Sequence, residues 1–402
     1  MELEEPRQLF NNPPWIQTWL HQLRNQYSVE HELDDGEFQE NFVDIIPEPW
    51  TVCCLTMDIH HDDLYLVRLR AGESPFVVKL PLNRLGWRSG AETVNGIYEN
   101  AATEFKEIIQ QSDDTIHSSA TYMENNDVDG WWKQRMALDQ RLKMLLTSIE
   151  HDWFGGFKGL LCGQYQEDEE ALSQLCQMVT QLVYKAAYNI TDDRSYSNKK
   201  CININSTICR MLVRLGPDPS SQDLQDVIYY LLSCYENQDV IVQYSLVDMP
   251  QLQEQFASAI RRYHQKARKA GVDPMQRLPN DHVILILDKY TQVFPLESLN
   301  IMRNQSVSRL PCLSFLRDRI QYVRAFTNHQ VNTEGEQPEA WTDLCVDRDS
   351  AFYILNPTGD LKHTQNEFES LFNNMKGWTG LVEKRPMEQE CRHALRSKDL
   401  YM

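Results

Sequence analysis

The pattern of hydrophobic and polar positions changes period along the chain, and residues 50–80 have the short period of β-strands. Apolar runs at 64–69 and 76–78 are rich in β-branched and aromatic residues. Polar clusters at 60–63 and 72–75 interrupt them. Short runs bounded by turn residues are typical of strands. This segment therefore predicts a small antiparallel meander or hairpin.

A helical period of three to four residues follows these strands. Apolar sets with this spacing predict helices near 90–111, 131–153, 172–186, 224–232 and 252–267. Gly155 and Gly156 stand where a left-handed residue would end one of them. The polar stretch at 112–130 predicts a loop. We interpret Trp131 and Trp132 as core anchors rather than as a platform for a ligand, because large aromatic side chains usually fill cores.

Two continuous apolar runs, at 282–287 and 351–355, have the length of strands and are rich in β-branched and aromatic residues. Such runs are typical of strands buried on both faces of a parallel sheet. A helical pattern follows each run, beginning at Pro311 and at a capping box that starts with Thr364. Residues 378–382 predict a third strand. This alternation predicts an open α/β sheet with right-handed crossovers.

We therefore expect an α+β chain with four segments. They are an N-terminal helical and acidic segment (1–49), a small antiparallel β element (50–82), a helical region (83–271) and an α/β sheet domain (280–402). Residues 399–402 look like the first residues of one more strand. Open α/β sheets keep their chemistry in loops at the carboxyl ends of strands. We therefore expect the last domain to be incomplete at its C-terminus.

Composition and charge exclude some classes of function. The net charge is −19, whereas a nonspecific nucleic-acid surface requires a basic balance. We expect no direct sequence-specific nucleic-acid binding, and solubility explains the acidic balance, although basic partners are compatible with it. No stretch approaches 18 apolar residues, so we expect no membrane span. Ten scattered cysteines without a signal peptide are typical of a reduced, intracellular chain.

No familiar catalytic or cofactor motif is present. The sequence contains neither GxGxxG nor GxxxxGKS/T, and it lacks HExxH, CxxC and GxSxG. We therefore expect no cofactor and no metal. The two histidines and two aspartates at 60–63 could suggest a metal ligand set. Adjacent positions in a turn rarely converge on one ion, and we interpret them as a polar turn tip.

Two loops lie where the site of an α/β sheet would form. Asp288 and Lys289 follow the first buried strand, and Asn356, Gly359 and Asp360 follow the second. We name these five residues as candidates for lining a binding cleft. The alternative for the second loop is structural, because Asn-Pro-x-Gly-Asp also suits a tight strand-to-helix turn.

A cysteine nucleophile would need a histidine within hydrogen-bond reach. Cys312 and Cys391 could on paper be paired with His363 or His393. Both cysteines lie inside helical apolar patterns, so we interpret them as core or surface thiols.

Several stretches stand in a characteristic order along the chain, namely 131–139, 149–153, 281–289, 294–299, 307–311, 353–364, 377–380 and 397–402. Taken together, they resemble the separase protease family. Leu296 stands where that family usually has tryptophan, which is a mild departure. The resemblance covers most of residues 50–402.

The resemblance implies a caspase-like α/β sheet and a cysteine endopeptidase that cleaves the kleisin subunit of cohesin after arginine, releasing sister chromatids. It also implies a securin-like inhibitor as partner and a location in cytoplasm and nucleus. The catalytic histidine of the family lies in a Gly-His-Gly motif, and the catalytic cysteine follows later. Neither motif is present in this sequence, so we assign no catalytic residue and expect both beyond Met402.

A second interpretation belongs to another class of function. The chain could be a natural, non-catalytic interaction or scaffold module built from the same helical and α/β parts. The transcript beyond codon 402 discriminates between the two. An apolar run followed by Gly-His-Gly favours the protease, and a stop codon favours the scaffold.

Overall fold

The computed structural model describes residues 14–28, 33–84, 96–119, 122, 127–190, 200–334 and 347–402. The chain divides into two compact units, residues 1–323 and 324–402. Both units combine helices with a sheet, which confirms the expected α+β class.

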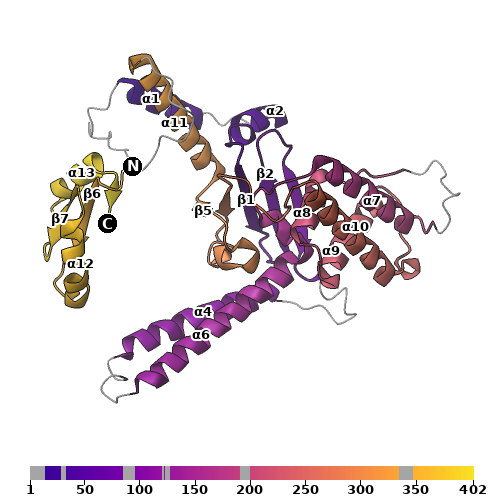
Figure 1. The fold of residues 1–402 in the computed structure, drawn as a ribbon, viewed down its shortest axis with the longest axis horizontal. Coiled ribbons are helices and arrows are strands. Elements are labelled where there is room, and N and C mark those ends of the chain that lie inside the picture. Colours follow the sequence, from indigo (N-terminus) through magenta and orange to yellow (C-terminus); the bar gives the residue numbers. More distant parts are fainter. Residues whose placement is uncertain are drawn as a thin grey trace. The chain divides into compact units, whose positions relative to one another are not determined.

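The first unit is built on a five-stranded sheet with the strand order β3-β2-β1-β4-β5 (Figure 1). Its strands are β1 (Trp50–Met57), β2 (Asp63–Leu69), β3 (Phe76–Pro81), β4 (His282–Leu287) and β5 (Val307–Leu310). The strands β1, β2 and β3 form the predicted antiparallel meander. In β3, buried Val78 and Leu80 flank exposed Lys79, so one face of the strand meets the core.

The pairing of β1 with β4 joins two distant parts of the sequence. The two strands run parallel, with Val52 opposite Ile284, and β5 runs parallel to β4 on its other side. The sequence pattern predicts separate segments for 50–82 and 280–402, whereas the structure combines strands from both in one sheet. Periodicity reveals strands but not their partners. The helical region between β3 and β4 supplies the long connection that separates the paired strands.

The sheet separates two hydrophobic cores, because successive side chains of a strand point to opposite faces. Cys53 and Leu55 belong to a large core on the helical side, and Val52 belongs to a smaller core on the other side. Four helices that contribute to the large core lie together on one side of the sheet (Figure 1). They are α7 (Glu169–Ala187), α8 (Ser206–Arg214), α9 (Ser221–Glu236) and α10 (Met249–Lys269).

The smaller core brings an N-terminal segment to a helix of the C-terminal third. Leu316 and Ile320 of α11 pack here against the sheet. The Tyr27 hydroxyl donates a hydrogen bond of 2.6 Å to Asp318, also in α11. The ring of Trp19 lies 5.1 Å from the ring of Tyr322. The elements on this side are α1 (Pro14–Ser28), α2 (Asp35–Phe38), the π-helix η1 (Gln39–Val43) and α11 (Leu313–Glu334).

Helices α4 (Ile97–His117) and α6 (Val128–Ile149) run side by side and extend away from the sheet (Figure 1). The polar stretch from residue 112 predicts a loop, but α4 continues to residue 117. Tertiary contacts support the additional turn, since the Trp131 indole and the Arg135 guanidinium donate hydrogen bonds to Thr115. Trp132 is 54% exposed, so the expectation that both tryptophans anchor the core is wrong for Trp132.

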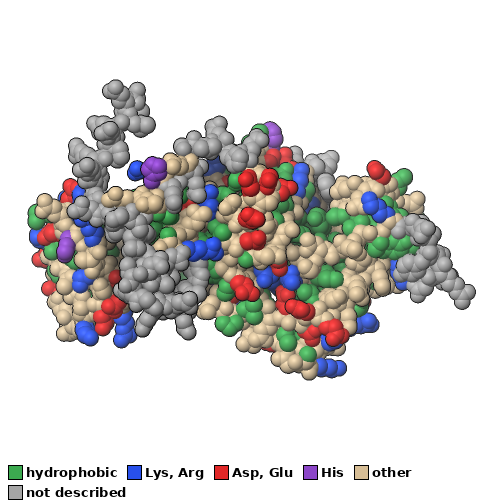
Figure 2. Space-filling view, turned by 90° about the horizontal axis from the view of Figure 1, so that it is seen from above, with side chains coloured by type: hydrophobic (Ala, Val, Ile, Leu, Met, Phe, Trp, Pro, Cys, Tyr) green, Lys and Arg blue, Asp and Glu red, His purple; other side chains and the backbone are tan. Residues whose placement is uncertain are grey.

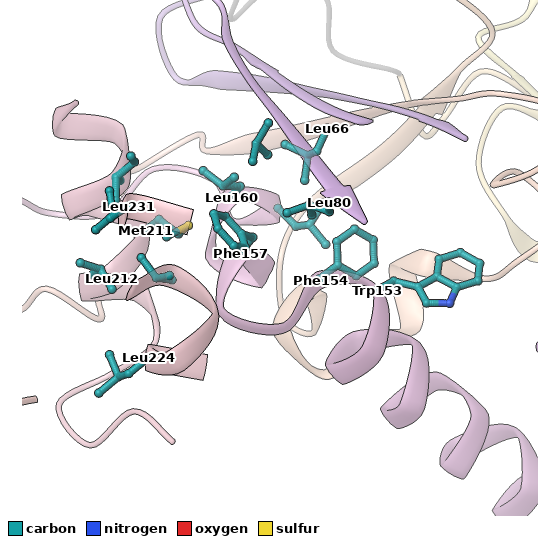
Figure 3. Packing of buried hydrophobic residues seen from close by; sticks show 14 of the residues in the cluster. Leu66, Leu80, Trp153, Phe154, Phe157, Leu160, Met211, Leu212, Leu224 and Leu231 are labelled. Carbon is teal, nitrogen blue, oxygen red and sulfur yellow. The ribbon is translucent and has the colours of Figure 1, made fainter. Parts of the chain in front are cut away.

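A tight reversal of chain direction after α6 packs against the sheet. It consists of the π-helix η2 (Glu150–Phe154) and the 3-10 helix η3 (Gly155–Leu161). A glycine ends the preceding helical segment, as predicted, but Gly155 has a φ of 51° and a ψ of −129° and so is not in the left-handed helical conformation. Figure 3 shows Phe157 of this reversal between Leu80 of β3 and Met211 of α8. The reversal therefore joins the sheet to the helical layer. The remaining short helices of this unit are the 3-10 helices η5 (Tyr244–Leu246), η6 (Leu296–Ser298) and η7 (Asn300–Met302).

The second unit has a parallel three-stranded sheet in the order β7-β6-β8. Its elements are β6 (Ala351–Leu355), α12 (Lys362–Asn374), β7 (Trp378–Val382), α13 (Glu388–Ser397) and β8 (Leu400–Tyr401). Residues at the end of the chain form a strand as predicted, with Leu400 opposite Ala351. The predicted capping box at Thr364 is absent, because α12 begins at Lys362 and Thr364 lies inside its first turn.

Acidic, basic and hydrophobic side chains are interspersed on the face drawn in Figure 2. In the part of the chain that the structure describes, no helix is long and apolar enough to cross a membrane.

The reversal at Gly156 provides a test of this packing. An added Cβ at Gly156 would overlap the Asp223 carbonyl and crowd Val227, both in α9. We expect Gly156→Ala to lower the free energy of unfolding by about 3 kcal/mol, measured by urea denaturation, because the well-packed backbone must shift.

Gly216→Ala is the matched control. Gly216 has a φ of 89°, but no atom lies within 4 Å of an added Cβ, so only backbone strain of about 1 kcal/mol is expected. Equal losses for the two variants would contradict the packing described for the reversal.

Candidate functional site

Asp288, the first of the five cleft candidates, ties the carboxyl end of β4 to that of β1. Its carboxylate accepts hydrogen bonds from the backbone N–H groups of Met57 (2.9 Å), Tyr290 (3.1 Å) and Thr291 (2.8 Å). The Thr291 hydroxyl donates a further bond of 2.8 Å. The Asp288 N–H itself donates to the Leu55 carbonyl. A carboxylate that accepts four hydrogen bonds stabilises the turn that its donors belong to. Asp288 therefore stabilises the turn after β4.

Lys289, the second candidate, is exposed, and its ammonium lies 4.6 Å from the centre of the Tyr290 ring. The Tyr290 carbonyl accepts a hydrogen bond of 3.2 Å from the Tyr98 hydroxyl. The ring of His61 lies 4.2 Å from the ring of Tyr98 and 4.5 Å from that of Tyr290. The loop after β4 and the turn after β1 therefore meet around one aromatic cluster.

The turn at 60–63 has the geometry of a polar tip. The Asp58 carboxylate accepts hydrogen bonds from the N–H groups of His60, Asp62 and Asp63. Asp side chains commonly stabilise turns in this way. Within the described ranges, no group of three or more His, Cys, Asp or Glu side chains is placed to hold a metal ion.

Arg309 of β5 fastens the segment that follows the first loop. Its guanidinium pairs with the carboxylate of Glu297 and donates hydrogen bonds of 2.6 Å to the carbonyls of Gln292 and Phe294. Burial tends to raise the pKa of Glu297, but the hydrogen bonds from Arg309 outweigh this and hold the pKa below its usual value. The stretches 294–299 and 307–311 are thereby joined.

The stretch 149–153 reaches the same segment from the helical region. The ring of Phe294 is fully buried and lies 5.0 Å from the ring of Trp153. The Glu150 carboxylate, also buried, accepts a hydrogen bond of 3.1 Å from the Ile301 N–H. Three of the stretches that carry the resemblance therefore form one contact region.

Arg68 is a buried cation that is not among the candidates predicted from the sequence. Its guanidinium donates hydrogen bonds to the carbonyls of Leu160 (2.6 Å), Cys162 (2.5 Å) and Gly163 (3.4 Å). Burial, with a contribution from nearby Arg214, lowers the pKa of Arg68 to about 10, so the side chain stays charged at neutral pH. The sequence does contain a signal for this buried cation, because Arg68 is a charged residue within the apolar run 64–69. Arg68 anchors the end of η3 to β2.

The loop after β6, which holds the other three candidates, is a tight turn. Asn356 is buried with a φ of 51°, and its side-chain oxygen accepts a hydrogen bond of 2.7 Å from the Leu361 N–H. The Asn356 amide donates to Gln365, also at 2.7 Å. Gly359 has a φ of 79° and bonds the Asn356 carbonyl, while Asp360 is exposed. The structural alternative therefore describes this loop well.

The five candidates thus occupy two turns, each at the carboxyl end of a parallel strand. Asp288 and Lys289 belong to the first unit, and the other three belong to the second. A role in lining a cleft stays a prediction for all five.

The thiol and imidazole candidates do not form a catalytic pair among the described residues. Cys312 accepts a hydrogen bond from the Phe315 N–H, and Cys391 contacts the Tyr401 hydroxyl at 3.4 Å. His363 is exposed, and its Nδ1 lies 3.9 Å from the Glu367 carboxylate on the same helix. In this part of the chain, no hydrogen bond joins a cysteine to a histidine.

The protein belongs to the α+β class, with a mixed sheet in its first unit and a parallel sheet in its second. A family model described as "Separin, protease domain" matches residues 59–402. The chain therefore belongs to the separin protease-domain family.

Individual relatives are similar over most of the chain. Separin of Emericella nidulans is 31% identical over 93% of this chain, and separin of Schizosaccharomyces pombe is 30% identical over 92%. Separin of Mus musculus is 26% identical over 92%. The chain spans 17%, 19% and 15% of the lengths of these three relatives.

The fold is similar to that of a solved separase. The crystal structure of the Saccharomyces cerevisiae separase–securin complex matches 90% of this chain and 22% of that chain, with a TM-score of 0.71 and 19% sequence identity. A second structure of the same complex matches 96% of this chain with a TM-score of 0.68.

The bond network of Arg309 predicts the effect of a conservative change. We expect Arg309→Lys to lower the free energy of unfolding by about 1–2 kcal/mol, because lysine cannot reach Glu297 and two carbonyls at once. Arg303→Lys is the control, since Arg303 is exposed and has no side-chain hydrogen bond within the described residues. A loss for Arg303→Lys as large as that for Arg309→Lys would contradict this assignment.

The sheet thiols provide a prediction for reactivity. Burial raises the pKa of Cys53 to about 11 and that of Cys54 to about 12. At pH 8 the thiolate fraction of Cys54 should be about a thousandfold below that of an ordinary thiol. We expect iodoacetamide to alkylate exposed Cys312 well before Cys53 and Cys54, as followed by peptide mass spectrometry.

The same reaction in 8 M urea is the control, in which all three thiols should react alike. Alkylation of Cys54 as fast as that of Cys312 in the folded protein would contradict the raised pKa described for the thiols of Cys53 and Cys54.

Proposed function

We propose that the chain is part of a separase-type cysteine endopeptidase that cleaves the kleisin subunit of cohesin after arginine and so releases sister chromatids at anaphase. The observation that carries this proposal is the match of the separin protease-domain family to residues 59–402. The similarity to separins from two fungi and the mouse, and the fold shared with yeast separase, support it. The proposed locations are the cytoplasm and the nucleus.

In this proposal the chain supplies the scaffold and part of the protease sheet. The catalytic histidine and cysteine lie outside these 402 residues, because the sequence lacks Gly-His-Gly. The absence of a cysteine–histidine hydrogen bond from the described part agrees with this assignment. In the complete site, the histidine would activate the thiol and backbone N–H groups would hold the oxyanion.

We also propose a securin-like inhibitor as a partner. The two solved structures that share this fold are complexes of separase with securin. The fold match covers nine-tenths of this chain, so an inhibitor that binds the corresponding region of separase would find a similar backbone here.

A non-catalytic interaction module is the second candidate function. The α4–α6 pair favours it, because Trp132, Met136 and Met144 of α6 are 54%, 60% and 63% exposed. Large exposed apolar side chains on one helix are typical of a surface that binds another protein.

Cleavage of a kleisin peptide tests the proposed function. We expect the purified 402-residue chain to leave an arginine-containing kleisin peptide intact. We expect a chain continued along its own transcript, through Gly-His-Gly and the downstream cysteine, to cleave it. That cleavage should be blocked by iodoacetamide and lost when the arginine of the peptide is replaced by glutamate.

Each other outcome is informative. Thiol-sensitive cleavage by the 402-residue chain would contradict the placement of the catalytic pair outside it. A continued chain that contains both motifs and cleaves nothing would contradict the protease. A stop codon after Met402 in several independent transcripts would favour the interaction module.

A further inference from the structure

Two cysteines of neighbouring helices meet at the border of the large core. Cys176 lies in α7 and Cys209 in α8, and both are free thiols. Cys209 is fully buried, whereas Cys176 is partly exposed and packs against the core from its edge. Cys176 stands between buried Leu175 and exposed Gln177. It therefore lies where the core meets the solvent.

Hydrogen bonds on either side of the two cysteines hold α7 and α8 together. The Glu167 carboxylate, just before α7, accepts a hydrogen bond of 2.8 Å from the Arg210 guanidinium of α8. The Thr180 hydroxyl of α7 accepts a hydrogen bond of 3.4 Å from the Ile204 N–H, just before α8. Positions 167 and 180 bracket the cysteine of α7, and positions 204 and 210 bracket the cysteine of α8. The two thiols are thus brought together by helix packing.

The two side chains interact directly. A hydrogen bond from the Cys209 thiol lowers the pKa of Cys176, and the charge of Arg210 acts in the same direction, against the opposing effects of burial and of Glu167. The same hydrogen bond, together with burial, raises the pKa of Cys209 well above its usual value. Cys176 is therefore the thiol that loses its proton first, and Cys209 is the donor that keeps its proton.

Exposure distinguishes this pair from other cysteines of the described part. Cys162 lies close enough to Cys53 to raise its pKa, but both side chains are fully buried, and burial raises the pKa of each. Exposed Cys312 accepts a hydrogen bond from the Phe315 N–H rather than from a thiol. Oxidants react with thiolates that they can reach, and a second thiol nearby completes a disulfide. Cys176 meets both conditions.

We propose that Cys176 and Cys209 form a reversible oxidation site, at which a hydroperoxide converts the two thiols into a disulfide between α7 and α8. Disulfides in reduced, intracellular chains are usually transient or redox-sensing, which agrees with a reversible site. The proposal concerns the chemistry of these two thiols and does not depend on the proposed function.

The reaction has two steps. Cys176 gives up its proton, and its sulfur attacks one oxygen of hydrogen peroxide. The sulfur–oxygen bond forms, the oxygen–oxygen bond breaks, and the departing hydroxide takes up the released proton, which yields a sulfenic acid and one water. The Cys209 sulfur then attacks the Cys176 sulfur. The sulfur–sulfur bond forms, the sulfur–oxygen bond breaks, and the Cys209 proton leaves with the hydroxide as a second water.

The balance of this reaction is complete with hydrogen peroxide as the oxidant. The two thiols together lose two electrons, and the peroxide is reduced to water. A dithiol reductant reverses the modification by thiol–disulfide exchange.

Peptide mass spectrometry of the 402-residue chain tests the proposal. The folded chain is treated with hydrogen peroxide, free thiols are blocked with N-ethylmaleimide, and the digest is compared with that of an untreated sample. We expect two peptides joined through Cys176 and Cys209, lighter by two hydrogens than the free peptides and separated again by dithiothreitol. This disulfide should form at least about tenfold faster than Cys312 is oxidised.

Variants separate the roles of the two thiols. In Cys209→Ala, the sulfenic acid of Cys176 should form more slowly, because the hydrogen bond is lost, and should persist until dimedone traps it. In Cys176→Ala, buried Cys209 should stay reduced. Cys312→Ala is the matched control, in which the disulfide should form at an unchanged rate. Circular dichroism and thermal melting check that each variant is folded, and the measurement on the unaltered chain needs no variant.

Three results would overturn the proposal. The first is the absence of the joined peptides when Cys312 is already oxidised. The second is a disulfide that joins Cys176 to a cysteine other than Cys209. The third is equally fast formation of the disulfide in concentrated urea, because the packing of α7 against α8 would then contribute nothing.

Discussion

The parallel pairing of β1 with β4 is the contact on which the first unit depends. It joins Val52 to Ile284 across the whole helical region, and the carboxylate of Asp288 then locks the ends of the two strands together. Closing so long a loop costs conformational entropy, which the buried faces of the sheet must offset. They do so on both sides, because side chains of β1 enter the large core and the smaller one alternately.

The stretches that identify the family are largely points where separate segments meet. Trp153 and Glu150 of the helical region contact Phe294 and Ile301, and Arg309 fastens that segment to β5. Arg68 holds the end of η3 with carbonyl acceptors in a buried position. Each such group would cost free energy if its partners moved apart, since a buried charge or polar group without hydrogen bonds is expensive. Buried contacts between separate segments therefore specify the fold of this scaffold.

Local structure was predictable because it depends on neighbouring residues. The strands at 64–69 and 282–287, the end of the helical segment at Gly155 and the turn at Asn356 follow from periodicity and turn chemistry. The pairing of β1 with β4 did not follow, because it depends on contacts between remote residues. Helix α8 and strand β5 are short, so tertiary packing rather than hydrophobic periodicity determines their secondary structure. The capping box at Thr364 failed because α12 begins two residues earlier, at Lys362, and the Leu361 N–H before it donates to the Asn356 side chain.

Hydrogen exchange tests the central pairing most directly. Amides of β1 and β4 can be followed by mass spectrometry at increasing urea concentrations, with β6 of the second unit as an internal comparison. If β1 and β4 form one cooperative sheet, their amides will lose protection at the same urea concentration. Loss of protection in β4 while β1 remains protected would contradict the account, because it would show that the two strands belong to separate folding units.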